Sequence, residues 1–317
     1  MGWGSLNIGY IFIILNMIVL GLSIPAGSVA MAAIPVWLFT AITLAIACII
    51  LLPSAKIYEK IKWKELGYKT YFGIFMQSLF TVTLYTVFLL YGLKYSSVIA
   101  AGIINSMVPA VTLVLSFILL GERLNIRKSL AIILAVSAVL IMELAGASTE
   151  GESSALGISF MILAVVSFGL FFVYAKKFAV EVPPVTMAAG LCLMGLLTTL
   201  PMAAYEAISF DWGKLTPSLW SAVIAYSLLG WVFAYVFTYL GIPKVPASTI
   251  GMATAIIPIT AMVYAVLFLG DELRTVDIIA TVLLIISIFI AESKEKEKEK
   301  IRNELTPTIE KKDAIGK

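Results

Sequence analysis

Ten apolar stretches, each long enough to cross a lipid bilayer, constrain this chain more than any other feature of its sequence. A helix needs about 20 apolar residues to span the hydrocarbon core. The chain is 61% hydrophobic and 13% charged, with a mean hydropathy of +1.03, which excludes a soluble globular protein. We therefore predict an all-α integral membrane protein. The predicted spans are 8–28, 33–52, 70–92, 97–120, 127–147, 155–178, 184–206, 218–240, 246–269 and 275–292.

The second half of the chain repeats the first half. Each copy holds an apolar helix with a central proline, a turn with Gly followed by an acid, and a second apolar helix. Repeats on this scale in a hydrophobic chain are typical of secondary transporters. We predict two five-helix units, 1–148 and 149–292, and a charged tail, 293–317. The matched residues, 149 positions apart, are Gly102 and Gly251, Pro109 and Pro258, Gly121 and Gly270, Leu124 and Leu273, and Glu143 and Glu292.

The positions of Lys and Arg predict how the helices cross the membrane, because cytoplasmic connections are enriched in these residues. With both termini cytoplasmic, the outside connections hold only Lys94, Lys214 and Arg274, and 19 basic residues lie inside. The turn at 121–128 is then basic and inside, whereas its counterpart at 270–274 is acidic and outside. Since each copy has an odd number of spans, the two copies cross in opposite senses. We therefore predict an inverted repeat around a central cavity.

Ionisable residues are missing from the centres of the predicted spans, and the chain contains no His. Such residues usually mark ion or proton paths in membranes, so a simple relay at the midplane is excluded. Without a metal-ligand cluster or a Ser-His arrangement, we expect no enzyme activity, no cofactor and no metal. Glu143 and Glu206, near the outer ends of spans, are either proton sites or interface carboxylates. Cys48 and Cys192 are interpreted as packing residues rather than a disulfide or metal pair.

Uncharged polar residues form stripes along several predicted helices. At about 100° per residue, Asn105 shares a face with Pro109, and Thr254 shares one with Pro258. A carboxamide that faced lipid would lack hydrogen bonds, so Asn and Gln must face protein or a wet cavity. The alternative is that these stripes only pack helices together, and that Tyr and Trp near span ends anchor them in the interface. The predicted substrate-binding residues are Asn16, Gln77, Thr81, Tyr85, Asn105, Trp231, Tyr235 and Thr254.

Two prolines are predicted to be hinges. Pro109 and Pro258 each lie 12 residues after the start of their spans, close to the midplane. A proline at this position removes a backbone hydrogen bond and kinks the helix. A static kink is the alternative, but matched kinks in inverted copies favour a pair of hinges beside a central site.

The sequence resembles a known family in two segments. Residues 91–124 and 246–273 look like the repeat ends of the EamA family, within the drug/metabolite transporter superfamily, and the resemblance extends over about 8–292. The Gly-Glu-Arg-Leu turn at 121–124 is fairly specific for the family, and the second copy departs from it with Gly-Asp-Glu-Leu at 270–273. The resemblance implies ten helices and a cavity lined mainly by spans one, three, four, six, eight and nine. Family members move amino acids, nucleobases, nucleosides, sugar phosphates, vitamins and toxic organic compounds, and many are exporters.

The predicted function is alternating-access export of a small neutral or zwitterionic metabolite, with hydrophobic or aromatic amino acids as the best candidates. Tyr85, Trp231 and Tyr235 offer ring faces, and Gln77 and Asn105 offer paired donors and acceptors. No fixed positive charge awaits a phosphate, and no buried acid awaits a cation. Nucleobase, nucleoside or drug export is the first alternative, and a membrane scaffold or receptor that transports nothing is the second. The expected partners are the substrate and the lipid bilayer of the plasma membrane, without nucleic acid, and the sequence is compatible with a homodimer.

Overall fold

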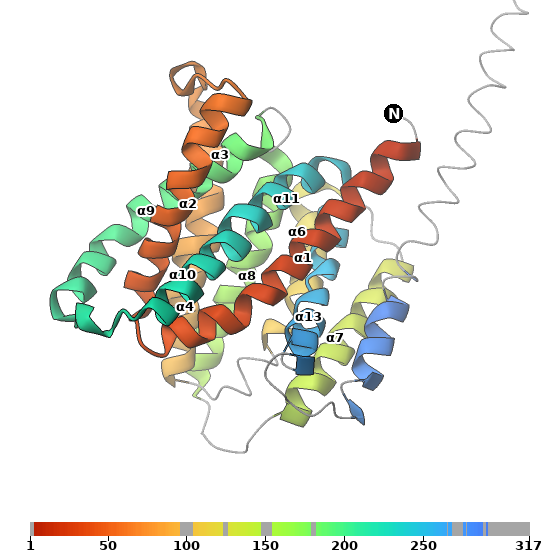
Figure 1. Cartoon of the computed structure of the whole chain (residues 1–317). Helices are drawn as coiled ribbons and strands as arrows, with labels where there is room; N and C mark the ends of the chain where they lie inside the picture. The colour runs from red at the N-terminus through yellow and green to blue at the C-terminus, as the bar shows by residue number, and fades with distance from the viewer. Residues whose placement is uncertain are drawn as a thin grey trace, which may run out of the picture.

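The computed structural model describes residues 3–95, 104–122, 126–146, 154–178, 182–264, 266–267, 275–276, 278–287 and 290. Within them all regular structure is helical (Figure 1), as the sequence predicted. Three predicted features lie outside the described residues: the start of the fourth span (97–103), the second Gly-acid turn (270–273) and the charged tail (293–317).

The helices follow the predicted spans. The first half contains α1 (Trp3–Met31), α2 (Val36–Tyr58), η1 (Trp63–Glu65), α3 (Tyr68–Ser78), η2 (Leu79–Leu84), α4 (Tyr85–Tyr95), α6 (Val108–Leu120) and α7 (Ile126–Gly146). The second half contains α8 (Ala155–Phe178), α9 (Pro184–Ser209), η3 (Trp212–Lys214), α10 (Pro217–Tyr226), η4 (Ser227–Phe233), α11 (Ala234–Gly241), η5 (Ile242–Lys244), α12 (Ala247–Ala253), α13 (Ile256–Tyr264) and helical residues 278–287.

Six of these helical segments are long and apolar enough to cross a membrane. They are Ile8–Met31, Val36–Tyr58, Tyr68–Gly92, Ala155–Phe178, Pro184–Ser209 and Pro217–Lys244. Shorter apolar helices occupy Val108–Leu120, Ala247–Thr260 and Ile278–Ser287. The chain is thus built as a multi-pass membrane protein, and the count of ten spans in inverted copies stays a prediction.

Irregular helix geometry occurs at corresponding places in the two halves. Two long helices contain π-helical segments, η2 within α3–α4 and η4 within α10–α11, and these segments begin 148 positions apart, at Leu79 and Ser227. Two other helices are broken by turns at 106–107 and 254–255, again 148 positions apart. Single π-helical turns inside α-helices are frequent at functional sites.

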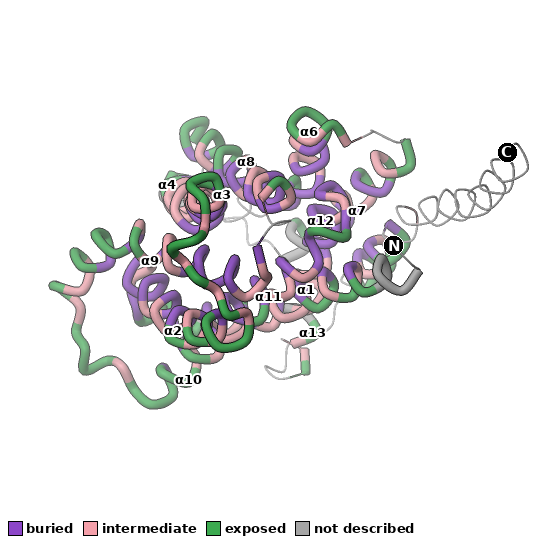
Figure 2. Tube along the Cα trace, turned by 90° about the horizontal axis from the view of Figure 1, so that it is seen from above, coloured by how far each residue is buried: buried purple, intermediate pink, exposed green. Residues whose placement is uncertain are grey.

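The helices pack as two groups that face each other, with a third unit, the α2–α9 pair, at one side of the molecule (Figure 2). The first, the α8 group, consists of α3, η2, α4 and α6 packed on α8. The second, the α1 group, consists of α10, η4, α11 and α13 packed on α1, with α12 leading into α13. The α2–α9 pair contacts both groups and is the most extensive helix pairing in the described residues. The two groups meet each other mainly where α12 crosses α6 and α8.

The α2–α9 pair is tied at both ends by carboxylates. Glu59, just after α2, accepts hydrogen bonds from the backbone N–H groups of Val185 (2.9 Å) and Thr186 (2.8 Å) at the start of α9. Glu206, near the end of α9, accepts one from the backbone N–H of Leu38 (2.8 Å) at the start of α2. Helix N-termini carry unpaired N–H groups and a partial positive charge, so each carboxylate stabilises the helix it reaches.

The distribution of buried and exposed side chains is the one expected for a protein in a membrane. Buried residues lie on the sides that helices turn toward one another (Figure 2), and large apolar side chains such as Ile49 (73% exposed) and Ile118 (65% exposed) point outward, as expected for lipid-facing positions. Cys48 and Cys192 are free and buried, in agreement with the predicted packing role. Gly251 permits the closest approach of α12 to α6, since a Cβ placed there would lie 2.5 Å from the Thr112 Cβ.

Candidate functional site

A cavity of about 340 Å³ lies between the two helix groups at mid-length of the helices. Three of the predicted substrate-binding residues, Tyr85, Asn105 and Thr254, line this cavity together with both predicted hinge prolines, Pro109 and Pro258. The α8 group contributes Tyr85, Asn105, Ser106, Val108, Pro109 and Phe168, whereas the α1 group contributes Leu20, Ser23, Ile24, Tyr226, Thr254, Ala255, Ile257 and Pro258, and Val139 comes from α7.

The two broken helices meet at this cavity. Proline has no N–H, so Pro109 and Pro258 cannot donate to the carbonyls four residues earlier, those of Asn105 and Thr254. Hydrogen bonds between residues three apart form near each break instead. The Met107 N–H donates to the Ile104 carbonyl (3.0 Å), and the Ile257 N–H donates to the Thr254 carbonyl (3.0 Å). The breaks therefore lie about one turn before each proline and not at the proline itself. They bring polar backbone to the cavity wall, where a continuous helix would bury it.

Hydroxyl, carboxamide and aromatic groups share the cavity lining. The Asn105 side chain is hydrogen-bonded to Tyr85, and the Tyr85 ring lies 5.3 Å from that of Phe168. The Ser23 and Thr254 hydroxyls donate to backbone carbonyls of their own helices, at 2.7 and 2.6 Å, which leaves their oxygen lone pairs available to accept. Among the described lining residues there is no Asp, Glu, Lys or Arg. Such a wall suits a ligand without net charge.

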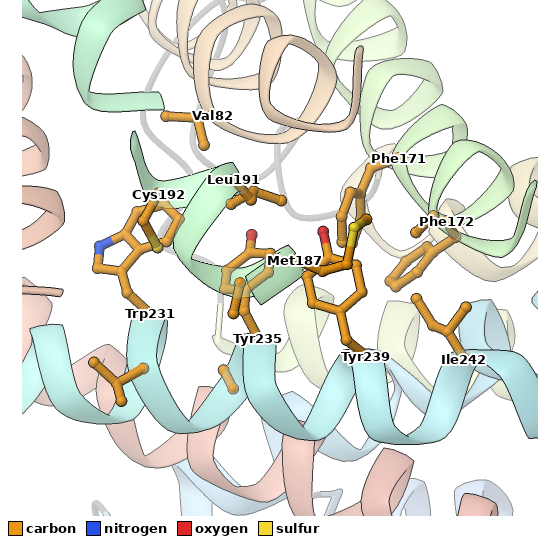
Figure 3. Close-up of a cluster of buried hydrophobic side chains, with 14 of the residues drawn as sticks. Val82, Phe171, Phe172, Met187, Leu191, Cys192, Trp231, Tyr235, Tyr239 and Ile242 are labelled. Atoms are coloured by element: carbon orange, nitrogen blue, oxygen red, sulfur yellow. The ribbon is translucent and has the colours of Figure 1, made fainter. Parts of the chain in front are cut away.

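Four of the predicted site residues lie behind the cavity wall, in a buried network that Figure 3 shows in part. Trp231 Nε1 donates to the Thr43 hydroxyl (3.0 Å), and the Trp231 ring stacks on Tyr235 at 5.5 Å. The Tyr235 and Thr81 hydroxyls are hydrogen-bonded at 3.1 Å. The Tyr239 hydroxyl donates to Gln77 Oε1 (2.8 Å), and Gln77 Nε2 donates to the Gly73 carbonyl (3.0 Å).

This network and Asn16 do not line the cavity in this structure. Asn16 lies in α1, is 1% exposed, and its Oδ1 atom has no hydrogen-bond partner among the described residues. Trp231 approaches the cavity through Tyr226, whose ring it contacts at 6.5 Å. The structure thus divides the predicted site into a part that lines the cavity and a part packed beside it.

The lining residues that were not predicted from the sequence include Ser106, Phe168 and Tyr226. Tyr226 precedes the π-helical segment η4, and Tyr235 follows it. At 100° per residue, Tyr226 lies about 140° from Trp231 and about 180° from Tyr235 around the helix, so it falls outside the face that the sequence singled out.

A second, larger cavity of about 510 Å³ lies between α4 and the α2–α9 pair. Its lining is mostly apolar, and the hydroxyls of its two threonines, Thr83 and Thr198, are hydrogen-bonded to each other at 2.8 Å. It therefore offers less polar chemistry than the central cavity, which is the better candidate for recognition of a metabolite.

Similar proteins are transporters. The model of the EamA-like transporter family matches the chain twice, over residues 7–144 and 155–292. The uncharacterized transporter YetK of Bacillus subtilis is 32% identical over 290 residues, which cover 91% of this chain and 88% of YetK. An uncharacterized transporter of Archaeoglobus fulgidus is 24% identical over 232 residues, covering 73% of this chain and 79% of its own length.

The fold is also found among solved structures. A crystal structure with 20% sequence identity superposes with a TM-score of 0.76, over 94% of this chain and 100% of its own. The family model covers most of the chain, and a relative above 30% identity covers nearly all of it. This multi-pass membrane protein therefore belongs to the EamA-like transporter family.

Proposed function

We propose that the chain is a secondary transporter that exports a small neutral or zwitterionic metabolite by alternating access. The observation that carries this proposal is the central cavity, where two broken helices from opposite halves meet around uncharged polar groups. Discontinuous helices in transporters commonly form the substrate site, because their exposed backbone can bind ligand at mid-membrane. The plasma membrane is its proposed location.

The cavity lining supports hydrophobic or aromatic amino acids as the substrate class. Tyr85, Phe168 and Tyr226 present aromatic rings, while Asn105 and Thr254 present hydrogen-bonding groups. α6 and α13 both begin beside the cavity, and the partial positive charge of a helix N-terminus favours a carboxylate. Nucleobases and nucleosides are the second candidate class, since the same rings could stack on a base.

Three observations support two inverted five-helix units within ten spans. The family model matches once in each half. The π-helical segments and the helix breaks recur at the same spacing of 148 positions. The Glu59 and Glu206 contacts are reciprocal, each joining the end of one helix of the α2–α9 pair to the start of the other. An antiparallel pair related by a two-fold axis would produce this arrangement.

Asn105→Ala is expected to weaken substrate binding about two- to tenfold, which is the effect of losing one hydrogen bond to a neutral group. Binding would be measured from ligand-induced shifts in melting temperature across a panel of amino acids, nucleobases and nucleosides. Ser137→Ala, on α7 outside the cavity, is the control. Equal weakening by the control, or normal binding by Asn105→Ala, would place the site elsewhere. Failure of the folded protein to move any panel compound in proteoliposomes would contradict the proposed transport.

The proposed orientation has both termini in the cytoplasm. A cysteine from Ser218→Cys, at the exposed start of α10, is expected to react with an impermeant thiol reagent added to intact cells. One from Lys64→Cys, in exposed η1, is expected to react only after the cells are opened. The native chain provides a low background, because Cys48 and Cys192 are buried. The reverse labelling pattern would overturn the orientation.

A further inference from the structure

Two carboxylates in this structure make nearly the same contact with two different helices. Glu59 accepts hydrogen bonds from two successive N–H groups at the start of α9 and from the Thr186 hydroxyl (2.6 Å). Glu122 accepts from the N–H groups of Ala247 (2.7 Å) and Ser248 (3.3 Å) at the start of α12, and from the Ser248 hydroxyl (2.6 Å). Both contacts are charge-assisted and reach across more than a hundred residues of sequence, so both hold distant helices together.

The two contacts differ in what they join. Glu59 connects α2 to α9, and this pair is also tied at its other end by Glu206. Separating α2 from α9 would therefore break the most extensive helix pairing in the described residues. Glu122 follows α6, directly after Gly121, whose left-handed backbone (φ 65°) ends that helix. The Glu122 contact joins the α8 group to the α1 group.

Other hydrogen bonds between the two groups gather at the same end of the molecule as Glu122. The ammonium of Lys176, in the last turn of α8, donates to the carbonyls that precede α12, those of Ile242 (2.7 Å), Pro243 (3.1 Å) and Val245 (2.9 Å). Deeper in the molecule, the hydrogen-bonded pairs Gln77–Tyr239 and Thr81–Tyr235 also cross between the groups, and Figure 3 shows the two tyrosines. The interface is therefore closed at this end.

The central cavity occupies the other part of the same interface. Its lining residue Val139 is 13 residues along α7 from Ile126, the end of that helix nearest Glu122, and Ile24 is 15 residues along α1 from Gly9, which packs against Lys244. The cavity therefore lies toward the middle of the helices, away from the Glu122 end. If the two groups rock to open the Glu122 end, the contacts of Glu122 and Lys176 must break, whereas those of Glu59 and Glu206 need not. The same chemical contact thus has opposite roles, decided by the helices that it joins.

We propose that Glu122 and Lys176 form a latch that closes one end of the transport pathway, and that the similar Glu59 contact is a permanent tie within the α2–α9 pair. This proposal rests on the proposed alternating access. Opening the latch separates α12 from α6 and exposes the α6 face below it. Ser116 lies on that face, one helical turn before the end of α6, and is fully buried, with its hydroxyl donating to the Thr112 carbonyl (2.7 Å).

The test measures the reactivity of thiols on both interfaces within one molecule. Ser116→Cys is a conservative change that places a reporter under the latch, while native Cys192 reports on the α2–α9 pair. The purified full-length protein is treated with N-ethylmaleimide, and the labelling rate at each thiol is followed by mass spectrometry. Adding Glu122→Gln is expected to speed labelling at the Ser116→Cys thiol about tenfold, the effect of losing roughly one charge-assisted hydrogen bond, without change at Cys192. Lys176→Gln should act in the same direction.

The matched control is Glu59→Gln, which removes the same kind of contact from the α2–α9 pair. It is expected to lower the melting temperature and to leave labelling at the Ser116→Cys thiol unchanged. Unchanged labelling in the Glu122→Gln variant, equal acceleration by Glu59→Gln, or equal acceleration at Cys192 would each overturn the proposal. Ser248→Ala is a milder latch variant if Glu122→Gln does not fold. Because the readout needs no substrate, a failed latch is distinguishable from a failed transport assignment.

Discussion

Replacing Trp231 with alanine is expected to lower the free energy of unfolding by about 3–5 kcal/mol, the usual cost of truncating a large buried aromatic residue. Trp231 is only 9% exposed, stacks on Tyr235 at 5.5 Å, and donates to the Thr43 hydroxyl of α2. Its loss removes a link between the α2–α9 pair and the α1 group. Denaturant or thermal unfolding of the purified protein measures the change.

Two further variants distinguish a packing role of Trp231 from direct contact with the substrate. Trp220→Ala, on α10 and 38% exposed, is the control and should change stability little. Trp231→Phe keeps a ring in the core and should recover part of the lost stability. If Trp231→Ala were as stable as the wild type but bound substrate weakly, Trp231 would contact the substrate directly, as the sequence predicted, and the interpretation as a packing residue would be wrong.

The double substitution of Pro109 and Pro258 by alanine is expected to slow turnover roughly tenfold or more while changing substrate affinity less. Each alanine restores an N–H that can donate to the carbonyl of Asn105 or Thr254, which favours a continuous helix through the cavity wall. Straightening both broken helices should stabilise one conformation over the other and slow their exchange. Initial transport rates in proteoliposomes and ligand-induced melting shifts measure the two effects separately.

Pro53→Ala provides the matched control for this prediction. Pro53 is also inside an apolar helix, but it lies in α2, within the α2–α9 pair, and is exposed to the surroundings. Its replacement is expected to leave turnover near the wild-type rate. Wild-type turnover in the double variant would mean that the breaks at 106–107 and 254–255 are static features of the fold.

Part of the candidate site was predictable because it depends on local rules. The lack of an N–H in proline acts within one helical turn, so Pro109 and Pro258 marked the broken helices without knowledge of the fold. The carboxamide of Asn105 had to reach protein or water, since lipid offers no hydrogen bonds. These residues lie together on the cavity wall.

Other residues could be placed only by the folded molecule. Trp231 and Tyr235 share a helix face and polar tips, which suit either a cavity or a core, and in the structure their partners are Thr43 and Thr81, more than 150 residues away in the sequence. Tyr226, which lies on another side of the same helical segment, lines the cavity instead. Neither the choice of partners nor the side of the segment that meets the cavity is a property of local spacing.

The sequence by itself determined that this chain crosses a membrane with apolar helices, that its halves correspond, and that prolines interrupt two of those helices. Each of these depends on composition or on spacing within a few turns, because a sufficiently long apolar helix is stable in a bilayer and a proline disrupts hydrogen bonds only in its own helix. The tertiary structure decided which polar groups line the cavity and which are buried in hydrogen bonds beside it. It also gave two similar carboxylates, Glu59 and Glu122, different roles, because a contact acquires its role from the helices it joins, and helix pairing depends on the whole chain.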